Sequence, residues 1–326
     1  MVTNYAHFNP SITFAVKFKC MRKLYFTPGP SELYFTAEHH MKMAFQQGIP
    51  SISHRSEKFK SLFKEATDNL RELLALPDDF HIVFTTSATE TWERIAENLI
   101  DQHALHFVNG AFSQKFYETV TNLNLKTTLY DAPWGTLPDV YNVPEGDYDF
   151  IGITHNETST GVGFPLNHIK VLRQKFPEAI LAVDAVSSLP QVDFNYKEVD
   201  AVYVSVQKCF GLPAGLGIWI MNDRCLERAK KLEAEGRTHK TYHSLSNLIK
   251  YAGKHQTPST PNVLNIYLLG KVIEDMLNRG IAMIRNETVY KSAILYNMLD
   301  RHEKLTPFVT DPKLRSNTVV VIESGD

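Results

Sequence analysis

The chain has 326 residues, of which 43% are hydrophobic and 21% charged, and its formal net charge is -2. This composition is typical of a globular protein and does not favour a disordered chain, and the small charge does not favour nucleic acid or an anionic membrane as a partner. No apolar run approaches the roughly 18 residues that a membrane helix needs. The cysteines, Cys20, Cys209 and Cys225, lack the paired spacing of a disulfide framework or a zinc site, which favours a reducing, cytoplasmic setting.

Hydrophobic periodicity predicts alternating helices and strands over most of the chain. Residues 1–20 are expected to be a non-native or disordered extension, because Met21 directly precedes the first well-formed motif. Beyond it, the pattern predicts helix 59–76, strand 81–85, helix 88–100, strand 103–109, helix 113–123, strand 127–130, strand 150–154, helix 166–176 and strands 179–185, 201–206 and 217–221. This alternation predicts an α/β fold with a mostly parallel central sheet sandwiched by helices.

The pattern changes after residue 262. Two long helices are predicted over 263–278 and 281–300, followed by one strand over 318–322. We therefore expect a large domain over 21–262 and a smaller α+β domain over 263–326. A single strand without a partner rarely makes a stable sheet, so the smaller domain is expected to be incomplete, truncated at its C-terminus.

Lys208 is the first candidate for chemistry. It ends the apolar stretch 201–208 and precedes a loop that contains Gly211, Gly215 and Gly217. Ligands bind at the carboxyl edge of open α/β sheets, and a desolvated lysine has a lowered pKa that suits Schiff-base chemistry. From this segment alone, the pattern is equally compatible with a lysine that has no chemical role and extends its side chain from the strand end to solvent.

Asp184 ends another apolar stretch, 179–184. Its carboxylate could pair with a protonated pyridine nitrogen, or it could cap the segment that follows. The stretch Thr85–Glu90 joins a strand to a helix and offers hydroxyl and N–H groups to a phosphate, although a plain helix cap has the same residues. The combination of Asp184 with Lys208 favours the functional interpretation of both.

Two further segments carry weaker signals. Phe112 lies at a strand-to-helix junction, where its face could stack on a flat ring, although an aromatic residue there is more often part of the core. His54 and Arg55 lie next to each other in a polar loop. They are either an ordinary pair of surface residues or a site that binds an anion.

Taken together, these segments resemble the class V (fold type I) pyridoxal-phosphate aminotransferases over roughly residues 21–326. Each segment is weakly specific, whereas the ordered set is specific. In chain order they are Phe26-Thr-Pro-Gly-Pro30, Ser53-His-Arg-Ser56, Phe84-Thr-Thr-Ser-Ala-Thr-Glu90, Asn156-Glu-Thr-Ser-Thr-Gly161, Val183-Asp-Ala-Val-Ser-Ser188, Ser205-Val-Gln-Lys208 with Gly215-Leu-Gly217, and Gln256-Thr-Pro258.

The resemblance implies that the chain binds pyridoxal 5'-phosphate (PLP) and assigns roles around the cofactor ring. Lys208 would form the Schiff base and move the substrate proton, and Asp184 would hold the pyridine nitrogen. Thr158 would donate a hydrogen bond to the phenolic oxygen, and Phe112 would stack on the ring.

The remaining roles implied by the resemblance concern the phosphate and the substrate. The cofactor phosphate would be bound by Ala88, Thr89 and Gln207. Gln256 and Thr257 would reach the phosphate of the neighbouring subunit, and His54 and Arg55 would bind substrate across the same interface. The resemblance therefore implies a homodimer with shared active sites.

Within the family, the Asn-Glu-Thr motif and the His-Arg pair resemble phosphoserine aminotransferases. The Thr-Pro-Gly-Pro start and the loop 212–217 resemble alanine–glyoxylate or serine–pyruvate aminotransferases. We expect transamination between a small amino acid and a 2-oxo acid, with phosphoserine and 2-oxoglutarate, as in serine biosynthesis, the favoured pair.

Other functions remain open at this stage. In family members, a segment after the last strand supplies the arginine that binds the substrate carboxylate, and this chain ends at Asp326. A homologue that binds the cofactor but transaminates poorly is therefore an alternative. A cysteine desulfurase would need a reactive cysteine on a late loop, which neither Cys209 nor Cys225 supplies well, and a dehydrogenase would need a Gly-x-Gly-x-x-Gly motif that the early strands lack.

Overall fold

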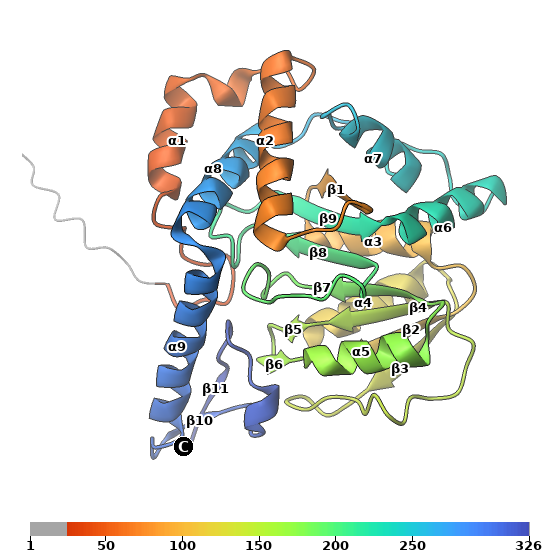
Figure 1. The fold of residues 1–326 in the computed structure, drawn as a ribbon. Helices are drawn as coiled ribbons and strands as arrows, with labels where there is room; N and C mark the ends of the chain where they lie inside the picture. Colours follow the sequence, from red (N-terminus) through yellow and green to blue (C-terminus); the bar gives the residue numbers. More distant parts are fainter. Residues whose placement is uncertain (1–24, 326) are drawn as a thin grey trace, which may run out of the picture.

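A computed structural model describes residues 25–325, so the predicted extension at residues 1–20 lies outside the described residues. Its centre is a seven-stranded sheet in the order β1-β9-β8-β7-β4-β2-β3 (Figure 1). In this sheet β9 runs antiparallel to the other six strands, which confirms the predicted α/β fold with a mostly parallel sheet. The strands are β1 (Phe80–Thr85), β2 (Ala104–Val108), β3 (Thr127–Asp131), β4 (Phe150–Thr154), β7 (Ile180–Asp184), β8 (Ala201–Ser205) and β9 (Gly217–Asn222).

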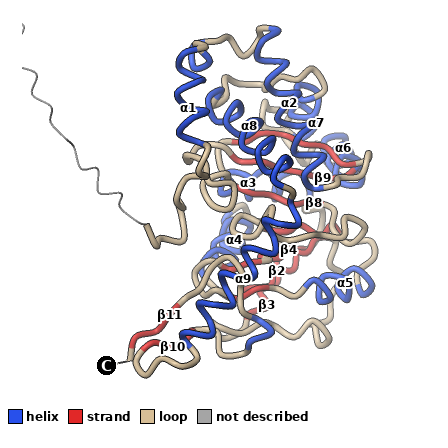
Figure 2. Tube along the Cα trace, turned by 60° about the vertical axis from the view of Figure 1, so that its left-hand side comes forward, coloured by secondary structure: helices blue, strands red, loops and turns tan. Residues whose placement is uncertain are grey.

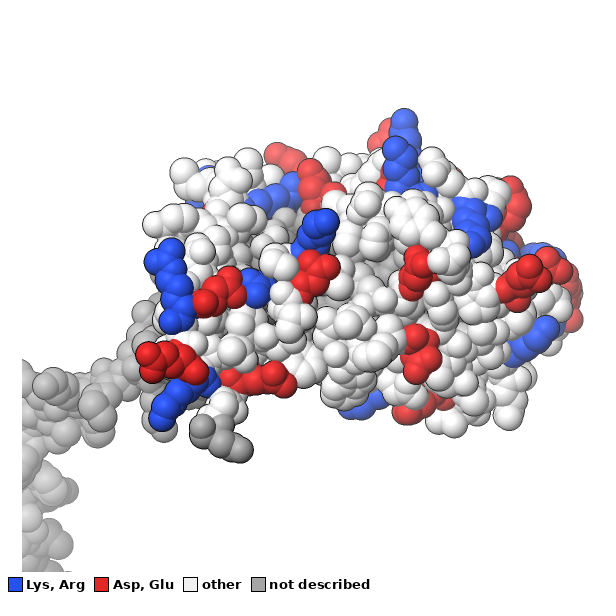
Figure 3. Space-filling view, turned by 90° about the horizontal axis from the view of Figure 1, so that it is seen from below, with Lys and Arg blue, Asp and Glu red and all other residues white. Residues whose placement is uncertain are grey.

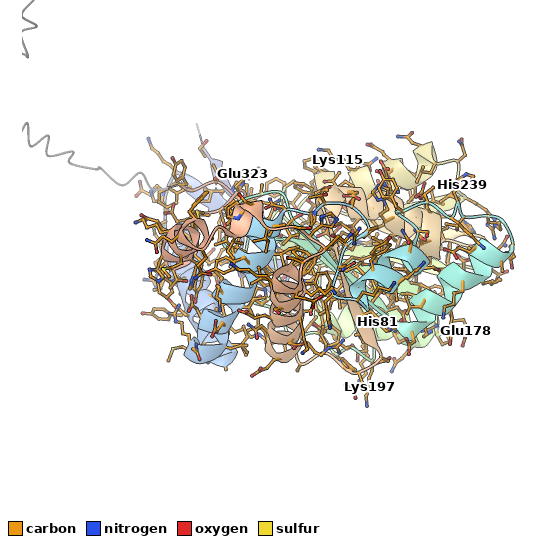
Figure 4. The ribbon with its side chains drawn as sticks, turned by 90° about the horizontal axis from the view of Figure 1, so that it is seen from above. His81, Lys115, Glu178, Lys197, His239 and Glu323 are labelled. Carbon is orange, nitrogen blue, oxygen red and sulfur yellow. The ribbon has the colours of Figure 1, made fainter. Side chains whose placement is uncertain are left out.

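Helices cover both faces of this sheet. One face packs on α3 (Ala88–Leu99), α4 (Ala111–Asn122), α6 (Asp223–Ala234) and α7 (Leu245–Ala252), and the other on α2 (Glu57–Leu74), α5 (Leu166–Lys175) and α8 (Val263–Arg279). Figure 4 shows Lys115, on α4, and Glu178, just after α5, on opposite sides of the molecule. The strands contribute alternate residues to the two cores: Leu181 and Val183 of β7 face one, and Ala182 faces the other.

The first long helix shows how closely the periodicity predicts an element. Most of the apolar residues from Phe59 to Leu74 are buried along one side of α2, and Leu62 is half-buried. The helix begins two residues earlier than predicted because the Ser56 hydroxyl accepts a hydrogen bond from the Phe59 amide at 3.2 Å. It ends at Leu74 because Ala75 adopts the left-handed conformation, with φ of 49°.

Other elements differ from the prediction. The helix α1 (Ala37–Gln46) was not predicted, since only Ala37 and Ala44 of its residues are buried and its apolar pattern is weak. It packs on α8 beside α2, whereas α9 (Ile281–Leu299) extends toward the other end of the molecule (Figure 2). The helix α7 was also not predicted, although its buried residues Leu245 and Leu248 have the i, i+3 spacing of a helix.

The prediction of a lone strand over 318–322 was wrong. The strand β11 (Ile322–Ser324) begins later and pairs antiparallel with β10 (Leu305–Pro307). Residues before it form a local turn instead, because the Ser316 hydroxyl accepts hydrogen bonds from the amides of Thr318 and Val319, each at 3.0 Å. The smaller elements are β5 (Asn156–Glu157), β6 (Val162–Gly163) and the 3-10 turns Ile49–Ser51 and Pro312–Leu314.

The surface carries charges of both signs. On the face shown in Figure 3, acidic and basic side chains are interspersed rather than gathered by sign. Among the described residues, no helix is long and apolar enough to cross a membrane.

Candidate active site

The sheet topology brings the candidate residues to one edge. Because β4, β7 and β8 are parallel neighbours, the residues that follow them in the chain meet at the carboxyl edge of the sheet (Figure 1). Asp184 is the last residue of β7, as predicted. Lys208 comes three residues after the end of β8, in the following loop rather than in the strand, and Thr158 comes four residues after β4.

The amine of Lys208 lies between a hydroxyl and an aromatic ring. Its Nζ donates to Thr158 Oγ1 at 2.8 Å and lies 4.7 Å from the centroid of the Phe112 ring. Burial lowers the pKa of Lys208, and the negative charge of Asp184 partly opposes this shift. The four residues Lys208, Thr158, Phe112 and Asp184, called here the Lys208 cluster, are therefore brought together by the fold.

An N-terminal segment covers this lysine. Ser31 donates from its amide to the Gln207 carbonyl at 2.8 Å and from its hydroxyl to the Lys208 carbonyl at 2.7 Å. A β-carbon on Gly29 would lie 2.9 Å from Lys208 Cε. A larger residue at position 29 would therefore require the Lys208 side chain to shift, which is a steric reason for the glycine of the Thr-Pro-Gly-Pro segment.

Asp184 is a buried carboxylate with little compensation. Burial raises its pKa to about 6, while the Val186 amide, which donates at 2.9 Å, and the charge of Lys208 act in the opposite direction. The indole nitrogen of Trp92 and the hydroxyl of Tyr203 are its polar neighbours, and both are buried without a hydrogen bond of good geometry among the described residues. This arrangement would favour a cation placed beside Asp184.

Sequence reasoning missed Ser187, which holds Thr158 in place. Thr158 Oγ1 donates to Ser187 Oγ at 2.9 Å, and Asn156 Nδ2 donates to the same oxygen at 2.7 Å. Ser187 Oγ in turn donates to the Asn156 carbonyl at 2.9 Å. Both Asn156 and Ser187 belong to the motifs quoted above, so the signal was present but had no assigned role.

The predicted phosphate residues lie at the start of α3 and after β8. The amide of Ala88 donates to Ser205 Oγ at 2.7 Å, a partner that the sequence did not reveal. Thr89 is exposed, and Ser87 Oγ accepts from the Glu90 amide at 3.1 Å as a helix cap. The backbone of Gln207 is held by Ser31. The Ala88 amide can therefore serve a phosphate only if it exchanges Ser205 for the new acceptor.

The remaining predicted residues form a second group. Arg55 donates to Gln256 Oε1 at 2.9 Å, to the Thr257 carbonyl at 2.8 Å and to the Pro258 carbonyl at 3.1 Å. His54 Nδ1 lies 3.4 Å from Thr260 Oγ1, and burial, together with Arg55, lowers the pKa of this histidine. We call His54, Arg55, Gln256 and Thr257 the Arg55 cluster. None of its described contacts reaches the Lys208 cluster.

The Lys208 cluster fits PLP by the chemistry of its groups. It contains a desolvated amine, a buried carboxylate that would favour a protonated ring nitrogen, and an aromatic face within reach of the amine. It does not fit a thiol nucleophile, because burial raises the pKa of the Cys209 thiol to about 12 and that of Cys225 well above its usual value.

Comparison with known proteins agrees with this chemistry. The model of the class V aminotransferase family matches residues 27–325, and the chain belongs to this family. Its members are PLP-dependent enzymes. A phosphoserine aminotransferase from Rhodococcus opacus is 33% identical over 279 residues, which are 84% of this chain and 73% of that protein.

Solved structures agree in fold. A phosphoserine aminotransferase from Cytophaga hutchinsonii is 44% identical, with a TM-score of 0.91, covering 93% of this chain and 84% of that one. An alanine–glyoxylate aminotransferase from Nostoc has a TM-score of 0.77 over 91% of this chain and 78% of that one, but is 21% identical and shows the fold alone.

Proposed function

We propose that this aminotransferase binds PLP on Lys208 and transfers the amino group of phosphoserine to 2-oxoglutarate. The observation that carries the cofactor site is the contact of Lys208 Nζ with Thr158 Oγ1 over the Phe112 ring, beside the buried carboxylate of Asp184. The names of the relatives support the choice of phosphoserine, and a role in serine biosynthesis would follow from it.

Lys208 and Asp184 would have different roles in the reaction. Bound PLP supplies an electron sink for the charge that develops at the substrate α-carbon. Lys208 Nζ, whose pKa is lowered by burial, would take the α-proton and return it at a neighbouring carbon. Asp184 would keep a proton on the ring nitrogen, since an uncompensated buried carboxylate favours a cationic partner.

Thr158 and Phe112 would orient the reacting groups. Thr158 accepts a hydrogen bond from Lys208 and donates to Ser187, so its hydroxyl would have to change partner to donate to the cofactor's phenolic oxygen. The Phe112 ring would cover one face of the cofactor and exclude water from it.

The Arg55 cluster would complete a neighbouring subunit's site in a homodimer. Arg55 is exposed and makes its hydrogen bonds with neutral oxygens of residues 256–258, so its charge remains free to attract an anion. A phosphate or carboxylate of the substrate is the chemistry that it would recognise. Ala88, Thr89 and Gln207 would receive the cofactor phosphate at the start of α3.

The amino donor is tested by rapid mixing of the PLP-loaded protein with single amino acids. Phosphoserine should bleach the visible cofactor band at low concentration, and glutamate should do so as the reverse-reaction donor. Serine and alanine should act only at much higher concentrations, because their side chains carry no phosphate or carboxylate for Arg55 to bind. Faster bleaching by alanine than by phosphoserine would instead assign an alanine–glyoxylate type of activity, and no bleaching by any of them would indicate a cofactor-binding but impaired protein.

A further inference from the structure

Glu157 is a buried carboxylate that the proposed chemistry does not use. It is 0% exposed and ends the short strand β5, at the start of the turn that leads to β6. Its two oxygens accept hydrogen bonds from the amides of Phe112 at 3.3 Å, Ser113 at 3.0 Å and Ser159 at 3.1 Å, and from the hydroxyls of Ser113 at 3.0 Å and Ser159 at 2.7 Å. A group surrounded by donors in this way acts as an acceptor throughout, which suits a carboxylate.

These hydrogen bonds cap the helix that carries Phe112. The residue before α4 is Gly110, which has no side chain to satisfy the first amides of the helix. Glu157 accepts from Phe112 and Ser113, and Ser159 Oγ accepts from the Ala111 amide at 2.9 Å. The turn at 157–159 therefore supplies the N-terminal cap of α4 from a different part of the sequence.

The turn at 157–159 and the start of α4 pack closely at Gly110. A β-carbon at this position would lie 2.4 Å from Glu157 Cγ and 2.6 Å from Ser159 Oγ. Any larger residue at position 110 would therefore push the turn away from the helix.

The same turn carries Thr158 between its two capping residues. The Gly161 amide closes the turn on the Glu157 carbonyl at 2.8 Å. While Glu157 and Ser159 contact α4, the Thr158 hydroxyl accepts from Lys208 Nζ at 2.8 Å. Phe112 and Thr158 both contact the amine of Lys208. Glu157 therefore fixes the positions of these two residues relative to each other.

Glu157 also adds negative potential to the site. The groups that donate hydrogen bonds to Glu157 among the described residues are neutral amides and hydroxyls. Its charge raises the pKa of Lys208 and of Asp184, although in each case burial is the larger effect. The potential therefore favours positive charge on the lysine nitrogen.

We propose that Glu157 is a positioning residue that locks Phe112 and Thr158 around Lys208 and stabilises positive charge at the Lys208 nitrogen. This proposal rests on the proposed PLP site, because it assigns a role to Glu157 only around that cofactor.

The test compares Glu157→Gln with Ser159→Ala in the full chain. Glutamine has nearly the same shape as glutamate, but its NH2 group would face the amides and hydroxyls that donate to Glu157. One backbone amide at the start of α4 would therefore lose its acceptor. We expect PLP to dissociate about tenfold more readily from Glu157→Gln. We also expect the pH at which the visible band titrates to fall, because the lysine nitrogen loses a favourable negative charge. Ser159→Ala keeps the carboxylate and should weaken PLP binding less, with an unchanged titration midpoint.

Gly110→Ala gives an independent readout if Glu157→Gln folds poorly. It leaves the charge in place but separates the turn from α4, so PLP affinity should fall while the band midpoint moves little. Wild-type affinity and midpoint in Glu157→Gln, or wild-type affinity in Gly110→Ala, would overturn the proposal. A wild-type chain that forms no visible band with PLP would overturn the proposed function itself, and this proposal with it.

Discussion

The Lys208 cluster and the Arg55 cluster are built in different ways. In the first, parallel strands bring a lysine and a carboxylate into a buried environment, and burial shifts both pKa values away from their usual range. In the second, an exposed arginine is held at the surface by neutral oxygens of one loop. The difference suggests that the first cluster performs the chemistry and the second supplies binding energy.

The largest expected effect comes from Asp184→Asn. Because the pKa of Asp184 is raised in the folded protein, ionisation of this carboxyl lowers the free energy of unfolding. This destabilisation is absent at pH values below the ordinary pKa of 3.8 and is complete at pH values above about 6. The cofactor-free variant should therefore be more stable than the wild type at pH 7.5 by up to about 3 kcal/mol. Its affinity for PLP should fall about 100-fold, because a buried charge pair is lost.

Chemical unfolding at pH 4.5 and 7.5, with PLP titration at the higher pH, measures both effects. Asp139→Asn is a control of opposite sign, because a hydrogen bond from the Tyr141 amide lowers the pKa of that exposed carboxyl. A cofactor-free Asp184→Asn protein that is less stable than the wild type at pH 7.5 would show that Asp184 is compensated in the folded chain.

A smaller effect is expected from Arg55→Lys. A lysine cannot reproduce the forked contact with an anion, so KM for phosphoserine should rise about tenfold with little change in kcat. Stability should change by less than about 1 kcal/mol, because the side chain is exposed. Steady-state kinetics with Arg279→Lys, at a helix end paired with Glu287, provides the matched control. An unchanged KM would remove Arg55 from the substrate site.

Mixed subunits sharpen the same comparison. If the two clusters meet across a dimer interface, hybrids of Lys208→Ala and Arg55→Ala subunits contain one intact site. At a phosphoserine concentration too low for the Arg55→Ala protein alone to turn over, random mixing of the two variants should then restore about a quarter of the wild-type activity. No recovery, with subunit exchange verified, would show that the two clusters do not share a site across the interface.

The smallest expected effect comes from Ser205→Ala, which removes the acceptor of the Ala88 amide. The cofactor-free protein should lose about 1 kcal/mol of unfolding free energy, as for other helix caps. The loss should be smaller with PLP bound, because its phosphate can accept from the same amide. Equal losses with and without PLP, measured by urea unfolding, would argue against a phosphate at the start of α3.

The sequence predicted the buried strands and the position of Asp184 at the end of one of them, because apolar runs such as 179–184 are typical of buried parallel strands. It could not reveal partners that the fold brings from distant segments, such as Ser205 for Ala88 or Glu157 for the amides of α4. The strand at the C-terminus was misplaced because its partner, Leu305–Pro307, is short and contains a proline, which is uncommon in strands.

The most direct test of the account locates the covalent attachment of the cofactor. The protein is loaded with PLP, reduced with borohydride, digested and analysed by mass spectrometry. The account predicts a stable adduct on Lys208 and none on the Lys208→Ala protein under the same conditions. An adduct of comparable yield on another lysine, or one that persists in Lys208→Ala, would contradict it.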